Sequence, residues 1–164
     1  MTTMKKKYVE EAMERTHQWL IRCKEAWTNR KTQSLFGIMQ GGMDDELRKK
    51  SGEFVSSLDL PGYAVGGLSV GEPKVVFIDT LKKCVDYLPL DKPRYVMGIG
   101  TPDYLFESVE NGVDMFDCVL PTRLARHGVA MTKHGNLNIK NKKFERDLGP
   151  LEEGCTCYAC QNYS

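Results

Sequence analysis

The chain has 164 residues, of which 41% are hydrophobic and 27% charged, and these values are ordinary for a globular domain or for part of a larger one. Its net charge of +1 indicates no class of partner, and the lack of any apolar run of about 18 residues argues against a membrane-spanning helix. The basic start, Met1–Lys7, has no apolar segment behind it, so we expect no secretory signal.

The first predicted element is a helix from about Lys5 to Trp27. Apolar and small residues recur there at helical spacing and form one stripe. The stripe consists of Val9, Ala12, Met13, Thr16, Trp19, Leu20, Cys23, Ala26 and Trp27. We expect Trp19 and Trp27 to pack in the core rather than to hold a ligand.

A strand, a glycine-containing loop and a helix then recur three times, and a fourth strand follows. The predicted strands are 35–39, 63–65, 95–97 and 113–118, and the predicted helices are 44–58, 73–87 and 101–111. Short strands that are apolar on both faces and separated by helices indicate a parallel sheet. A barrel and an open doubly wound sheet both fit this α/β pattern. Both folds place functional sites at the carboxyl ends of strands, where the glycines lie.

Polar and proline residues mark where the predicted helices begin. Asp44 or Asp45 suits the amino end of the first, because a carboxylate can accept hydrogen bonds from unpaired backbone N–H groups there. Pro73 suits the first turn of the second helix, and Thr101 with Pro102 opens the third.

After Pro121 the pattern changes to a predicted β-hairpin over residues 129–139, whose turn includes Gly135 and Asn136. The segment Arg123–Arg146 holds seven basic residues and one acidic residue, so it carries +6 while the rest of the chain carries −5. Such a segment can bind phosphates, although a solvated loop would have the same composition.

Asp117 is the first candidate for chemistry, because it ends the fourth strand on the expected functional edge. A carboxylate there can act as a nucleophile, a base or a metal ligand. The alternative is an aspartate that caps the following segment, which is the commoner case. Asp114 lies three residues earlier and points to the opposite face of an extended strand, so we expect a structural role for it.

The turns after the other strands are candidates for binding a flat heterocycle. Gln40 ends the first strand, and its amide can form paired hydrogen bonds with a purine edge. Gly67 with Leu68 offers backbone amides that a ring can approach, and Met97 offers an apolar wall. Simple turns explain the same residues, and no dinucleotide-binding motif is present.

Three cysteines crowd into six residues at Cys155, Cys157 and Cys160. Thiolates at this spacing can bind one Zn²⁺, but a closed structural site needs four ligands, and no cysteine or histidine follows them. The histidines that could supply a fourth ligand lie upstream: His17, His127 and His134. Unliganded thiols are the alternative. Because the cysteines form no disulfide pattern, we also expect a reducing, cytoplasmic compartment.

These residues resemble the tRNA-guanine transglycosylases of bacterial type. The matching segments are 36–42 (FGIMQGG), 62–72 (GYAVGGLSVGE), 95–100 (YVMGIG), 112–123 (GVDMFDCVLPTR) and the cysteine cluster. They occur in the family's order and cover nearly the whole chain. The resemblance implies the second half of a (β/α)8 TIM barrel with an appended zinc-binding subdomain. It divides the chain into a leading helix (1–30), a half-barrel with the nucleophile (31–122), and a basic hairpin with part of the zinc site (123–164).

The resemblance also implies a reaction, in which guanine at the tRNA wobble position is exchanged for a 7-deazaguanine, a queuosine precursor. Asp117 would attack the ribose C1′ and form a covalent ribosyl-enzyme. Gln40, Gly67 and Leu68 would hydrogen-bond the base, and Met97 would stack against it.

The resemblance assigns the second part of the chain to tRNA and metal binding. Arg123 and Arg126 would hold tRNA phosphates, and the three cysteines would be ligands of a structural Zn²⁺. Val70, which follows Ser69, favours the aminomethyl precursor base over queuine.

The sequence departs from the family in three respects. It lacks an Asp-Ser-Gly-Gly stretch, whose aspartate is the general acid/base, and a second substrate-binding aspartate before the first helix. The fourth zinc ligand, a histidine, is also absent. We therefore expect a fragment of a longer parent protein, with little or no base exchange by itself.

Two other functions fit the sequence. One is a non-catalytic module that binds tRNA or pairs with another half-barrel, and the other is a purely structural zinc-binding piece. An open half-barrel exposes strand edges and apolar surface, so we expect self-association, in particular a homodimer.

Overall fold

The computed structural model describes residues 6–163, so part of the basic start, residues 1–5, lies outside the described residues. The chain divides after Cys118 into two compact units, which we call unit 1 (up to Cys118) and unit 2 (from Val119). The boundary expected from the resemblance, after residue 122, lies four residues further along the chain. None of the helices within 6–163 combines the length and the apolar composition that crossing a membrane requires.

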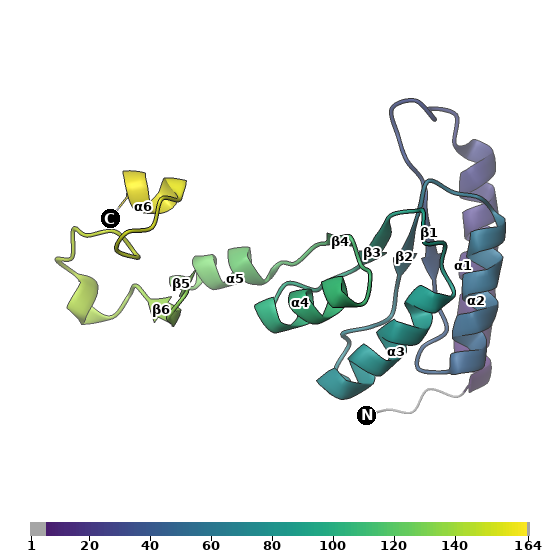
Figure 1. Cartoon of the computed structure of the whole chain (residues 1–164), viewed down its shortest axis with the longest axis horizontal. Coiled ribbons are helices and arrows are strands. Elements are labelled where there is room, and N and C mark those ends of the chain that lie inside the picture. Colours follow the sequence, from purple (N-terminus) through teal and green to yellow (C-terminus); the bar gives the residue numbers. More distant parts are fainter. Residues whose placement is uncertain (1–5, 164) are drawn as a thin grey trace. The chain divides into compact units, whose positions relative to one another are not determined.

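A parallel sheet of four strands forms the centre of unit 1 (Figure 1). Its strands are β1 (Phe36–Met39), β2 (Gly62–Val65), β3 (Arg94–Val96) and β4 (Met115–Phe116), in the spatial order β1-β2-β3-β4. This confirms the predicted α/β pattern and the parallel pairing, although β4 is shorter than predicted. The order of the strands does not reverse within the described residues, so the sheet has no switch point of the doubly wound kind.

Four helices belong to unit 1: α1 (Lys6–Ala26), α2 (Asp45–Ser57), α3 (Lys74–Asp86) and α4 (Pro102–Glu110). Each contacts the next in sequence, α1 with α2, α2 with α3 and α3 with α4, as in a layer wound in one direction. The predicted helix start at Asp44 is confirmed, because its carboxylate accepts from the Leu47 N–H at 3.1 Å.

Side chains alternate between the two faces of the sheet, and the strand register aligns them in rows. One row consists of Met39, Val65, Val96 and Phe116, which face the helices and belong to the core or pack against it. The adjacent row consists of Ile38, Ala64, Tyr95 and Met115, on what we call the open face of the sheet. The open face is less well covered, since Met115 is 46% exposed.

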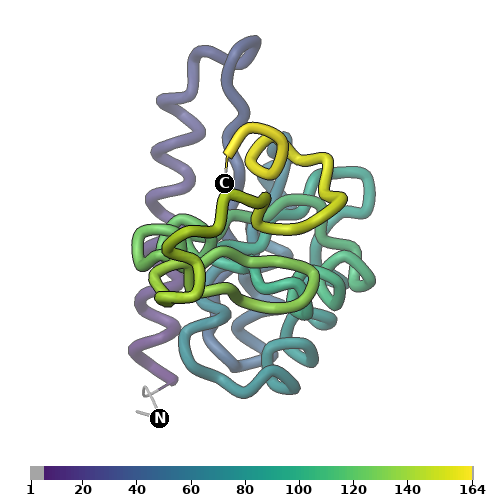
Figure 2. Tube along the Cα trace, turned by 90° about the vertical axis from the view of Figure 1, so that its left-hand side faces the viewer, coloured from purple at the N-terminus to yellow at the C-terminus, as the bar shows by residue number. Residues whose placement is uncertain are grey.

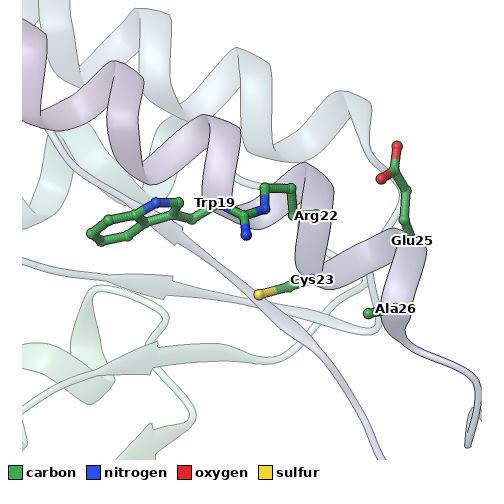
Figure 3. A pocket seen from close by; sticks show the side chains of 5 residues that line it. All are labelled: Trp19, Arg22, Cys23, Glu25 and Ala26. Carbon is green, nitrogen blue, oxygen red and sulfur yellow. The ribbon is translucent and has the colours of Figure 1, made fainter.

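The prediction for the first helix is partly wrong, because Trp19 is 56% exposed rather than in the core. The buried residues of α1 are Met13, His17 and Leu20, which lie three or four positions apart and so share one side of the helix. Trp19 lies at the edge of the predicted stripe, and with Arg22 and Cys23 it lines a hollow along α1 (Figure 3). Trp27 is partly buried and packs against the core, as expected.

Unit 2 contains α5 (Leu120–Arg126), the hairpin strands β5 (Val129–Thr132) and β6 (Gly135–Asn138), a 3₁₀ turn (Lys142–Phe144) and α6 (Tyr158–Asn162), the short turn near the yellow end of the trace in Figure 2. The predicted hairpin is confirmed, but its turn is Lys133–His134, and Gly135 and Asn136 pair within β6. The helix α5 was not predicted, because Pro121 suggested a stop. Proline is tolerated in the first turn of a helix, where its missing N–H would have had no partner.

Candidate active site

The candidate side chains of unit 1 gather where the strands end. The strands β1 to β4 are directly followed by Gln40, Gly66, Met97 and Asp117. The alternation of the strands carries these positions to the same side as the open face. The structure therefore brings the predicted nucleophile and the predicted base-binding turns to one edge of one sheet.

Two donors hold the carboxylate of Asp117. The Tyr95 hydroxyl donates to Oδ1 at 2.5 Å, and the Gly98 N–H donates to the same oxygen at 2.9 Å. Both bonds lower the pKa of Asp117, and the bond from Tyr95 has the larger effect. The carboxylate in turn raises the pKa of Tyr95. Asp117 is exposed, so it is an oriented anion that a substrate can reach.

Asp114, the rival aspartate, has the structural role expected for it. Its Oδ2 accepts from the backbone N–H of Arg94 at 2.8 Å, at the start of β3. Its own N–H donates to the Arg94 carbonyl at 2.9 Å. Asp114 therefore takes part in the pairing of β3 with the segment before β4 and is not available for chemistry at the carboxyl edge.

Gln40 is anchored through its backbone and lies across the next turn. Its N–H donates to the Ser51 hydroxyl at 2.9 Å, and that hydroxyl is also hydrogen-bonded to the buried His17 at 2.9 Å. A Cβ at Gly66 would lie 3.0 Å from the Gln40 amide nitrogen and 2.8 Å from Ile38. Glycine at 66 is therefore required for the Gln40 amide to lie where it does.

The turn after β2 presents backbone rather than side chains. Gly67 is exposed and has φ of +70°, whereas the side chain of Leu68 is buried in the core. Only the backbone of Leu68 is thus offered to a ligand. The carboxylate of Glu72 holds the rest of the turn by accepting from the N–H groups of Ser69 and Val70, the latter at 2.9 Å.

The residues of this site that escaped the sequence reasoning include Tyr95, Glu72 and Arg48. Glu72 could have been noticed as the last residue of a conspicuous glycine-containing segment. Arg48 could have been noticed as a charged residue beside Leu47 on the inner side of a predicted helix. Arg48 is 1% exposed, and its guanidinium donates to backbone carbonyls of both turns.

Met97 follows β3 and is partly buried, and the next residue, Gly98, has φ of +74°. This left-handed backbone, which glycine adopts without a steric penalty, lets the Gly98 N–H reach Asp117. Met97 therefore lies next in sequence to the group that orients the candidate nucleophile.

In unit 2, the predicted phosphate-binding residues are both on α5. Arg123 and Arg126 are exposed and lie three positions apart, in the last turn of the helix. Residues at this spacing are neighbours on a helix surface, so the two guanidinium groups can act on the same phosphate-bearing strand.

The three cysteines of unit 2 form a cluster that could hold a metal ion. Their sulfurs all lie within 4.8 Å of one another. The backbone N–H of Cys160 lowers the pKa of the Cys157 thiol, which favours the thiolate that a metal binds. Zn–S bonds of about 2.3 Å place two sulfurs on one tetrahedral ion about 3.8 Å apart, so small side-chain rotations would suffice. Among residues 6–163, no histidine joins this cluster.

Comparison with known proteins places these observations in a family. The family profile described as queuine tRNA-ribosyltransferase matches residues 1–164. Proteins named queuine tRNA-ribosyltransferase from Natranaerobius thermophilus and Ruminiclostridium cellulolyticum are 57% and 54% identical to the chain over 157 residues, and one from Staphylococcus haemolyticus is 54% identical over 158. Each match covers 96% of this chain but only 42% of the relative's length. The chain thus belongs to the queuine tRNA-ribosyltransferase family, as the resemblance of its motifs predicted.

Proposed function

We propose that the protein exchanges guanine at the wobble position of tRNA for a 7-deazaguanine, and that this chain supplies the nucleophile and part of the base-binding site. The observation that carries the proposal is the placement of Asp117. It is an exposed, oriented carboxylate on the same sheet edge as Gln40 and Gly67. The names of the relatives, which describe transfer of a ribosyl group involving tRNA and queuine, support this reaction class.

The reaction is a double displacement at the ribose C1′, as in retaining glycosidases. An oxygen of Asp117 forms a bond to C1′ while the bond from C1′ to the guanine nitrogen breaks, and the base leaves with the electron pair. The departing guanine takes up a proton from solvent. The 7-deazaguanine nitrogen then attacks C1′ and gives its proton to solvent, while the bond from C1′ to the Asp117 oxygen breaks and releases the carboxylate. The lowered pKa of Asp117 serves both steps, because the group must be anionic to attack and must leave as an anion.

The base that is exchanged must leave the stack of the anticodon loop and enter the site. The Gln40 amide and the backbone of Gly67 and Leu68 would pair with its polar edge, and Met97 would stack on its ring. Val70 after Ser69 favours the aminomethyl precursor as the incoming base.

The sheet supports a half-barrel, the second half of a (β/α)8 fold. Its strands follow one another in sequence order, its helices contact one another consecutively, and its open face carries Ile38, Tyr95 and Met115 where a barrel interior would be. Active sites of such barrels lie at the carboxyl ends of the strands, where Asp117 lies.

Unit 2 would contribute the tRNA contact and a structural zinc site. Arg123 and Arg126 would bind phosphates, because exposed guanidinium groups attract the nucleic-acid backbone. Cys155, Cys157 and Cys160 would hold Zn²⁺, which would stabilise the fold of unit 2 without entering the reaction. A fourth ligand would complete the tetrahedral set.

A chimera tests the proposal. This chain would replace the matching region of the Natranaerobius thermophilus relative, so that the remaining part of that relative is present. We expect the chimera to incorporate labelled guanine into tRNA, and we expect Asp117→Asn to reduce the rate by about a thousandfold or more. Asp114→Asn is the matched control. It should retain exchange, because the Asp114 carboxylate only accepts a hydrogen bond from the backbone N–H of Arg94, and an asparagine oxygen can accept the same bond.

The results separate two functions. Exchange that persists in Asp117→Asn would show that this aspartate is not the nucleophile. A chimera without exchange, combined with salt-sensitive tRNA binding by the 164-residue chain that is lost in the Arg123→Gln, Arg126→Gln double variant, would favour the non-catalytic tRNA-binding module. The exposure of both arginines is the observation that supports this second function.

A further inference from the structure

A buried arginine lies beneath the two turns that carry the candidate base-binding residues. Arg48, on α2, donates from Nε to the Gly42 carbonyl at 2.7 Å and from Nη1 to the Gly66 carbonyl at 2.8 Å. Nη1 also lies 3.3 Å from the Met39 carbonyl, which accepts from the Gly66 N–H at 3.0 Å. One guanidinium thus joins the end of β1, its turn, and the turn after β2.

The charge of Arg48 is not neutralised in a close ion pair. Glu72 is the carboxylate whose charge acts on Arg48, but its oxygens accept instead from Ser69 and Val70. Within residues 6–163, Nη2 of Arg48 is buried and has no hydrogen-bond partner. A Cβ at Gly67 would lie 3.6 Å from this nitrogen, so the spare donor is directly behind the exposed glycine of the turn.

Burying this guanidinium costs stability. A buried cation loses hydration, and an unsatisfied buried donor adds to that cost. Burial accordingly lowers the pKa of Arg48, yet an arginine keeps its proton in proteins. The sheet edge therefore contains a fixed positive charge that no side chain of the described residues neutralises by direct contact.

The bond to Gly66 acts on the neighbouring N–H group. The Gly66 carbonyl and the Gly67 N–H belong to the same peptide group, and a charged donor on the carbonyl polarises the whole group. Polarisation makes the N–H a stronger donor. Gly67 is one of the residues proposed to hydrogen-bond the base, and a base that leaves C1′ gains negative charge.

We propose that Arg48 is a positioning residue that fixes the Gln40 and Gly67 turns relative to each other and strengthens the Gly67 N–H as a donor to the carbonyl oxygen of a bound purine. This inference rests on the proposed function for its ligand. The strengthened Gly67 N–H would let the site discriminate a 6-oxopurine from a purine without that oxygen. The same donor would stabilise the negative charge on the departing base.

The first arm of the test needs no ligand. In ¹H–¹⁵N spectra of the 164-residue chain, Arg48→Lys should shift the Gly67 amide proton upfield, because one ammonium cannot reproduce the bond to Gly66 together with that to Gly42. Arg94→Lys is the matched control. Arg94 is also buried, at 6% exposed, and donates to three carbonyls, those of Leu88, Pro89 and Gly112, far from Gly67 in the chain.

An unchanged Gly67 resonance in Arg48→Lys, or an equal change in Arg94→Lys, would overturn the proposal. If Arg48→Lys does not fold, the wild-type chain decides the question. The Arg48 Nε proton should exchange with solvent far more slowly than that of exposed Arg123, and equal exchange rates would contradict the inferred clamp.

The second arm uses guanine and 2-aminopurine, which lacks the carbonyl oxygen, as probes of the same chain. We expect Arg48→Lys to weaken guanine binding about tenfold, the effect of losing one charge-assisted bond, and to leave 2-aminopurine binding within twofold. A wild-type chain that binds neither base would count against its proposed base site, while the amide shift would still decide the role of Arg48. Equal losses for both bases would reduce Arg48 to a structural clamp and overturn its role as a donor-strengthening group.

Discussion

At the scale of single residues, Tyr95 lowers the pKa of Asp117, the candidate nucleophile. Its hydroxyl is the largest cause of the lowered pKa of Asp117. In Tyr95→Phe this donor is lost, so the pKa of Asp117 should rise toward that of an ordinary aspartate, although Gly98 still donates. A carboxylate with a higher pKa becomes protonated at higher pH, so the acid limb of base exchange by the chimera should also move to higher pH.

The measurement is a carbon-13 NMR titration of Asp117 in wild type and in Tyr95→Phe. Tyr104→Phe is the control, because its ring packs against Phe77 on the helix side. Identical titration midpoints for Asp117 in wild type and Tyr95→Phe would contradict the assigned role of the hydroxyl.

At the scale of elements, the stability of the segment that carries Cys155, Cys157 and α6 should depend on bound metal. Zn²⁺ bound by Cys155, Cys157 and Cys160 would tie this segment together, and a metal bound only by the folded state adds its binding free energy to stability. We expect Cys157→Ser to bind Zn²⁺ at least about tenfold more weakly and to unfold at a lower temperature than wild type in the presence of zinc. A chelator should remove the difference between the two proteins.

Zinc content by mass spectrometry and thermal unfolding followed by circular dichroism would check this expectation. Cys23→Ser is the matched control, because Cys23 is exposed on α1 in unit 1. Wild-type chain that takes up no zinc would show that three thiolates do not suffice and would leave them as unliganded thiols.

At the scale of the whole molecule, unit 1 should self-associate through its sheet. The edges at β1 and β4 pair with no further strand among the described residues, and Met115 on the open face is exposed. Unpaired edges and exposed apolar side chains favour association. We expect sedimentation to show a dimer or larger species at high concentration, and Met115→Lys to weaken it.

Leu148→Lys provides the comparison, because Leu148 is a highly exposed apolar residue of unit 2. A compact monomer of the wild-type chain at all concentrations would rule out this mode of association. If Met115→Lys and Leu148→Lys changed self-association equally, the open face of the sheet would not be the contact surface.

The sequence predicted the elements that depend on local patterns. The strands at β1, β2 and β3, the cap at Asp44 and the hairpin each have a short-range signal, namely apolar runs, a helix-start residue or a turn. The exposure of Trp19 could not be predicted, because helical spacing does not say which edge of a wide stripe faces the core. For Arg48 the sequence offers only its place beside Leu47 on a predicted helix and not its role, because its three acceptors are backbone carbonyls, which leave no mark in the sequence.

The alternation of side chains along β4 limits how this protein can change in length. Asp117 reaches the carboxyl edge on the open face because it lies two residues beyond Met115. One inserted residue between them would turn the carboxylate toward the helix layer, among Val96 and its apolar neighbours, where its charge would be costly. Insertions and deletions in this strand should therefore survive in descendants only in pairs.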